Sequence, residues 1–194
     1  MSSFKDKIIG SFELLLLFGR GVNRFSGTKS EGLKSIIVAV LVFLAQVPFN
    51  IYICPPKGME TGYSHAQIFI TLVTSFVVAY VFGAIVIWQF AAWLERSDRF
   101  WLYFSACNWT QIPANLICVP FMVMLAYGVD RDQMDTALTF LMLYGYVVLG
   151  VISCYALRLN WQIAIGFATT AMFVDREVLR LVYQVQGIPW PWKH

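Results

Sequence analysis

The stretch CNWTQIPANLICVP, residues 107–120, lies within a run that has no charged side chain from 100 to 128. Such a run is long enough to cross roughly 30 Å of hydrocarbon as a helix, which takes about 20 residues. Four polar side chains nevertheless stand in its middle: Asn108, Thr110, Gln111 and Asn115. Because an unpaired amide is costly in hydrocarbon, these side chains must face protein or water rather than lipid.

Asn108, Gln111 and Asn115 recur at the spacing that places side chains on one stripe of a helix. Two explanations fit that stripe. Polar side chains within spans usually form hydrogen bonds between helices, each worth about 0.6–2 kcal/mol, and we expect that role here. The alternative is a hydrated cavity or conduction path along the stripe.

The composition of the 194-residue chain agrees with a membrane environment, because 59% of its residues are hydrophobic and 13% are charged. An ordinary soluble domain has about 45–50% apolar and about 25% charged residues. The charged residues comprise 14 Lys and Arg against 11 Asp and Glu and form no basic face, so we expect no nucleic-acid partner. The composition predicts an all-α, polytopic membrane helix bundle.

The apolar blocks predict a transmembrane domain over 35–183 with about five helices, at about 35–53, 68–94, 100–128, 137–157 and 159–180. For the last helix, a re-entrant or interfacial arrangement is the alternative to a full span. We favour the span because the segment QIAIGFATTAMFV, 162–174, has no charge.

Asp175 and Arg176 follow that segment directly. Transporters that are driven by protons or ions usually carry a buried carboxylate, and Asp175 is the one candidate. The adjacent Arg176 favours a simpler interpretation, in which the two side chains form an ion pair at the end of the span.

The amino-terminal segment, 1–34, is basic, and Phe4, Ile8, Phe12 and Leu15 recur in it at helical spacing. This pattern predicts a short helix. We expect a short interfacial helix on anionic lipid at the cytoplasmic side, and a helix packed on the spans is an alternative that fits the pattern equally well.

The distribution of Lys and Arg predicts the orientation, because these residues accumulate on the cytoplasmic side. With the amino end inside, the inner side carries nine basic residues and the two outer loops carry two. We therefore expect a multi-pass protein of the inner (cytoplasmic) membrane with a cytoplasmic amino end. The nine are Lys5, Lys7, Arg20, Arg24, Lys29, Lys34, Arg96, Arg99 and Arg158, and the two are Lys57 and Arg131.

The tail, 184–194, ends in GIPWPWKH. Indole rings prefer the membrane–water interface, so Trp190 and Trp192 are predicted to be interfacial anchors.

The sequence lacks the motifs of common enzyme classes. It has no phosphate-binding glycine loop and no HExxH pattern, and its histidines are His65 and His194. A haem or metal site would need more ligands than these. We therefore predict a non-enzymatic protein without a cofactor.

The layout of a basic amino end followed by five closely spaced spans, with FWLYFSACNW at 100–109, resembles the small bacterial inner-membrane proteins of the Yip (Ypt-interacting protein) domain class. The resemblance implies a five-span helical fold and transfers no functional residue. The D-L-Y-G-P signature of the eukaryotic members is absent, so their role in vesicle traffic is not implied.

Two functions fit these features. The leading hypothesis is a scaffold or accessory subunit, surrounded by membrane lipids, that binds other integral membrane proteins or itself through its spans. The alternative is a small carrier or channel for a lipid or small solute, which would use the polar stripe of the third span. The carrier requires water or substrate at Asn108, Gln111 and Asn115, whereas the scaffold requires only dry hydrogen bonds.

Overall fold

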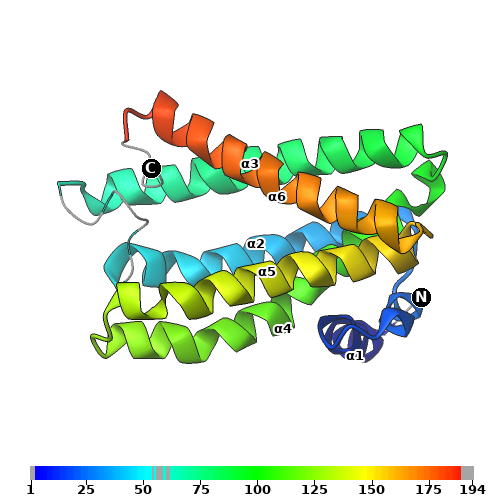
Figure 1. Ribbon diagram of the computed structural model, residues 1–194, viewed down its shortest axis with the longest axis horizontal. Coiled ribbons are helices and arrows are strands. Elements are labelled where there is room, and N and C mark those ends of the chain that lie inside the picture. The colour runs from blue at the N-terminus through cyan, green and yellow to red at the C-terminus, as the bar shows by residue number, and fades with distance from the viewer. Residues whose placement is uncertain (1–2, 54, 56–58, 60–61, 189–194) are drawn as a thin grey trace.

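The computed structural model describes residues 3–53, 55, 59 and 62–188, and every regular element in that part of the chain is helical. Five long helices run side by side, and a short helix lies at one end of the bundle (Figure 1). The elements are α1 (Phe4–Leu15), the 3₁₀ helix η1 (Gly19–Arg24), α2 (Lys29–Tyr52), α3 (His65–Trp93), the 3₁₀ helix η2 (Ser97–Arg99), α4 (Phe100–Ala126), α5 (Arg131–Ala156) and α6 (Trp161–Val185).

Among the described residues, four helices are long and apolar enough to cross a membrane, namely α2, α3, α4 and α5. This confirms an all-helical, multi-pass membrane protein. Helix α6 has the length but not the composition, because its second half carries Asp175, Arg176, Glu177 and Arg180. The fifth span therefore stays a prediction.

Several helices begin earlier than the hydropathy pattern predicts, because polar caps start them outside the apolar blocks. Helix α2 begins at Lys29 rather than 35, and the Thr28 side chain accepts a hydrogen bond from the Glu31 amide. Helix α3 begins after a capping box of Ser64 and Gln67. These side chains satisfy backbone amides that have no partner within the first helical turn.

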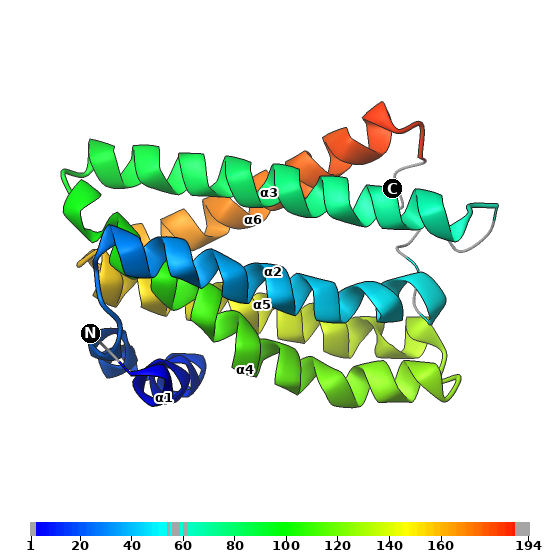
Figure 2. The ribbon, with the colours of Figure 1, turned by 180° about the vertical axis from the view of Figure 1, so that it is seen from behind.

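The long helices form two layers, one of α3 and α6 and the other of α2, α4 and α5 (Figures 1 and 2). Helices α2 and α4 approach closely because Gly32 faces the Trp101 ring, and a Cβ at that position would overlap the ring. Helix α3 turns much of its surface outward, with Val77, Ile85 and Trp88 about half exposed. Such a surface is suited to lipid.

Helix α6 runs back to the end of the bundle where α3 begins. The Thr71 hydroxyl of α3 donates a hydrogen bond of 2.5 Å to Oε1 of Gln186. Just beyond α6, Ile188 is buried in a small apolar cluster with Met59 and Ile68. The path of α6 is thus as long as that of the neighbouring spans.

Helix α1 packs against α4 and α5. Leu14 is fully buried, and the ring of Phe4 meets that of Trp109 edge to face at 5.4 Å. The Tyr144 hydroxyl of α5 donates a hydrogen bond to the Leu15 carbonyl. Helix α1 is thus packed on the spans, while Phe12 and other apolar side chains of the segment remain exposed. Its interfacial position stays a prediction.

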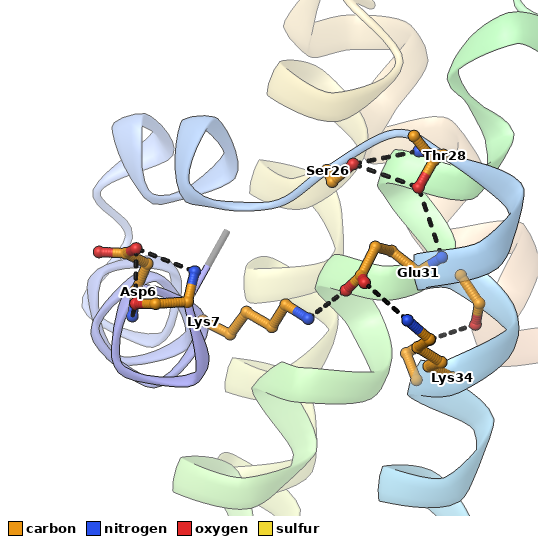
Figure 3. A network of polar contacts seen from close by, with 9 residues as sticks. Asp6, Lys7, Ser26, Thr28, Glu31 and Lys34 are labelled. Atoms are coloured by element: carbon orange, nitrogen blue, oxygen red, sulfur yellow. Dashed lines mark hydrogen bonds and ion pairs between the residues drawn. The ribbon is translucent and has the colours of Figure 1, made fainter. Parts of the chain in front are cut away.

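Ion pairs fasten the amino-terminal segment to the bundle, and we call this group the amino-terminal clasp. Glu31 at the start of α2 bonds to Lys7 of α1 and lies 3.4 Å from Nζ of Lys34 (Figure 3). Within the segment, the Arg24 guanidinium donates to both oxygens of Glu13 at 2.8 and 2.9 Å. The clasp comprises Asp6, Lys7, Glu13, Arg24, Glu31 and Lys34.

Candidate functional site

Asn108 of α4 joins three helices through its side-chain amide. Its Nδ2 donates a hydrogen bond of 2.8 Å to the Ser35 hydroxyl of α2, and its Oδ1 accepts one of 3.2 Å from the Tyr80 hydroxyl of α3. Asn108 is only 2% exposed. Both the donor and the acceptor of this amide are therefore used within the protein, as expected for a hydrogen bond between spans.

Asn115 also connects two helices. Nε2 of Gln46 on α2 donates to Asn115 Oδ1, and Asn115 Nδ2 donates to the Gln111 carbonyl at 2.8 Å. Thr110 acts only within α4, because its hydroxyl donates to the Ala106 carbonyl at 2.7 Å. These groups therefore hold α4 to α2 or satisfy α4 itself.

Gln111 differs from the two asparagines on its stripe. Its side chain is half-buried, and it forms no hydrogen bond within the part of the chain that the structure describes. It instead lines a cavity between α3, α4, α5 and α6. The stripe thus has two amides between helices and one amide at a cavity.

The cavity has a volume of about 650 Å³ and is partly open rather than enclosed. Most of its wall is apolar and aromatic, with Phe76, Phe90, Phe104 and Phe167 among its members. On every helix the lining residues lie in or near the half of the bundle that contains the α3–α4 corner and the α5–α6 turn. The amino-terminal segment lies at the same end (Figure 1).

A few polar side chains interrupt the apolar wall. They are Tyr80, Tyr103, Asn108, Gln111, Thr170 and Asp175, and the described lining contains no Lys, Arg or His. Tyr103 is fully buried, and its hydroxyl lies beside the side chains of Cys107 and Ser153.

Asp175 lies on the face of α6 that turns toward the bundle. The buried residues of α6 follow one helical stripe, and Asp175 falls on that stripe between Ala168 and Val178. The structure has no ion pair between Asp175 and Arg176 among its described residues, since successive helical side chains point in different directions. Both side chains are exposed in the isolated chain.

Four members of the site escaped the sequence interpretation, namely Ser35, Gln46, Tyr80 and Tyr103. Of these, Gln46 is an amide within an apolar block and could have been recognised as a partner for α4. Trp190 and Trp192 lie outside the described residues.

No protein-family model, curated protein or solved structure matches this chain. Inferences about function therefore rest on the chemistry of the cavity.

Proposed function

We propose that this membrane protein binds one amphipathic, lipid-like molecule in the cavity between α3 and α6, and so acts as a small lipid carrier. The observation that carries the proposal is a half-open cavity of about 650 Å³ with an aromatic wall and a few polar groups. Binding pockets for small molecules have volumes of about 300–1,000 Å³ and the same mixture of apolar walls and sparse polar groups.

The position of Gln111 supports a ligand rather than a purely structural role. An amide that is turned toward lipid without a partner is costly, whereas an amide that meets the polar part of a bound amphiphile is satisfied. Asn108 and Tyr80 form the adjoining wall and are already bonded to each other. They provide a rigid polar surface beside the free amide of Gln111.

The proposal includes a membrane arrangement, namely five spans in the inner membrane with a cytoplasmic amino end. The path of α6 along the full length of α3 supports the fifth span. The amino-terminal segment, the α3–α4 corner and the α5–α6 turn lie at one end of the bundle, where Arg99 donates to the Ala156 carbonyl at 3.0 Å (Figure 1). The basic residues of these segments thus share one side, and the cavity lies in the cytoplasmic half.

A scaffold or accessory subunit is the second candidate. The exposed apolar faces of α2 and α3 favour it, because they offer area for other membrane proteins. Lipid covers such faces equally well, however, and Asn108 and Asn115 are satisfied within the chain. The cavity therefore supports ligand binding more specifically than partner binding.

Photo-crosslinking tests the proposed function. The purified chain in phospholipid nanodiscs is incubated with a long-chain fatty alcohol that carries a diazirine, and adducts are located by peptide mass spectrometry. We expect saturable labelling of the cavity segments of α3 and α6. Gly83 and Gly166 line the cavity, and a Cβ at either position meets no atom within 4 Å, so Gly83→Leu and Gly166→Leu introduce side chains into open space at the cavity.

These two variants should lower the labelling of the cavity while the protein stays folded. Gly145→Leu is the matched control, because this helical glycine also has open space around it but does not line the cavity. Labelling that is non-saturable, or that is equal in all three variants, would count against a binding cavity.

A further inference from the structure

We propose that the cavity selects amphiphiles with a positively charged amine head group and that Asp175 is the residue that recognises the ammonium. This inference rests on the proposed function, because it assigns a chemical class to the ligand of the same cavity. Its basis is the placement of one carboxylate, without a cationic partner, in a wall that is otherwise apolar or neutral.

The charge of Asp175 has no compensation within the described lining. That lining contains no Lys, Arg or His, so no side chain in the cavity wall can form an ion pair with the carboxylate. An unpaired carboxylate is strongly disfavoured in an apolar environment. A bound cation would remove this penalty, whereas a neutral ligand would leave it and an anionic ligand would increase it.

The basic residues nearest in sequence are directed elsewhere. Arg176 and Arg180 do not line the cavity, and Arg180 is paired with Glu177 at 2.7 Å on the exposed surface of α6. Glu177 therefore has a partner on its own helix, while Asp175 has none among the described residues. The two acidic residues are two positions apart and differ in the face that they occupy.

The remaining polar groups of the cavity suit an ammonium. A primary ammonium has three donors, which can bond to the Asp175 carboxylate and to acceptor oxygens such as Oε1 of Gln111. Aromatic rings line the rest of the wall, among them Phe90 and Phe167, which are stacked with centroids 4.6 Å apart, and Phe167 lies about two helical turns from Asp175 along α6.

The apolar remainder of the wall fits the alkyl chain of the ligand. Phe76, Ile87 and Val174 line the cavity with no polar side-chain atoms. A molecule with one ammonium and one alkyl chain therefore matches both parts of the wall, with its ammonium end at the Asp175 carboxylate.

Two photoreactive probes that differ only in the head group test this inference. A diazirine-bearing alkylamine is compared with the alcohol of the same chain on the full-length protein in nanodiscs of phosphatidylcholine, which has no net charge. An alkylamine is protonated at neutral pH. We expect the amine to label the cavity with a half-saturating concentration about tenfold or more below that of the alcohol, since charge-assisted hydrogen bonds are stronger than neutral ones.

Three variants test whether Asp175 causes the preference for the amine over the alcohol. Asp175→Asn should remove the preference, so that the two probes have about the same half-saturating concentration, and Asp175→Glu should retain it. Glu177→Gln is the matched control on α6 and should behave as wild type.

The outcomes separate the two proposals. If the alcohol labels the cavity and the wild-type protein does not prefer the amine, or if Asp175→Asn keeps the preference, amine selectivity is wrong while the lipid-binding function stands. If neither probe labels the cavity, the proposed function itself fails. The comparison of the two probes on the wild-type protein needs no variant to fold.

Discussion

Asn108 and Gln111 lie about one turn apart on α4 but have different surroundings. Asn108 is buried and bonded to Ser35 and Tyr80, whereas Gln111 is half-buried at the cavity. Removal of a bonded buried amide leaves its partners unsatisfied, which is the expensive case. Removal of an amide without a protein partner has no such cost.

This contrast predicts that two similar substitutions have effects of different size on stability. Asn108→Leu should lower the free energy of unfolding by about 1–3 kcal/mol, because the Tyr80 hydroxyl loses its acceptor and the Ser35 hydroxyl loses its donor while keeping its bond to the Gly32 carbonyl. Gln111→Leu should change it by less than about 0.5 kcal/mol. Reversible unfolding in mixed micelles, followed by circular dichroism, measures both. Equal destabilisation by the two substitutions would show that Gln111 is also held between helices.

The sequence could identify the polar stripe but not the different roles of its three amides. The spacing of Asn108, Gln111 and Asn115 shows that they share a helix face, and hydrocarbon requires that face to be turned inward. Which amide finds a partner depends on residues of α2 and α3 that are far away in the sequence. That information is tertiary, so the hydropathy pattern does not contain it.

At the scale of the elements, ion pairs of the amino-terminal clasp hold helix α1 in place. The Glu13–Arg24 pair of the clasp lies outside the spans, and the Arg24 guanidinium bonded to Glu13 lowers the pKa of that carboxyl below its ordinary value of 4.5. A carboxyl whose pKa is lowered by folding stabilises the folded state above its ordinary pKa, and the stabilisation is lost as the pH falls through the folded pKa.

We therefore expect the folded state to lose stability in acid as this ion pair is lost. Between about pH 7 and about pH 3, the melting temperature of the wild-type protein should fall as Glu13 becomes protonated. Glu13→Gln should have a lower melting temperature at neutral pH and a smaller change over the same range, because a Gln side chain has no carboxylate that can be protonated. Differential scanning fluorimetry at constant ionic strength is sufficient. A pH dependence identical to that of the wild type would exclude the Glu13–Arg24 pair as a contributor.

Helix positions were largely predictable from the sequence, and helix ends were not. The apolar blocks locate α2 to α5 because each must cover the hydrocarbon. Caps such as Thr28 and Ser64 lengthen α2 and α3 into the polar region, where hydropathy has no signal. Helix α6 was hardest to classify because its charged half packs beside α3, so contacts rather than composition decide its path.

At the scale of the whole molecule, the proposed topology places the amino end in the cytoplasm and the end of α6 outside. Reporter fusions after Ser97 and at His194 test it, with alkaline phosphatase active outside and a fluorescent protein active inside. We expect a cytoplasmic signal at Ser97 and an external signal at His194. An external signal at Ser97 would reverse the orientation. A cytoplasmic signal at His194 alone would make α6 re-entrant.

The pairing of α2 with α4 has a consequence for the order of membrane insertion. Gln46 and Ser35 of α2 find their partners at Asn115 and Asn108, which are 69 and 73 residues later in the chain. During synthesis, α2 enters the bilayer before the Gln46 amide has its partner, whereas the Ser35 hydroxyl is already bonded to the Gly32 carbonyl of its own helix, and α3 must follow before α4 supplies the matching amides. The growing chain therefore needs a temporary polar environment for α2, and the bundle closes around α2 and α4 only after the third span has been delivered.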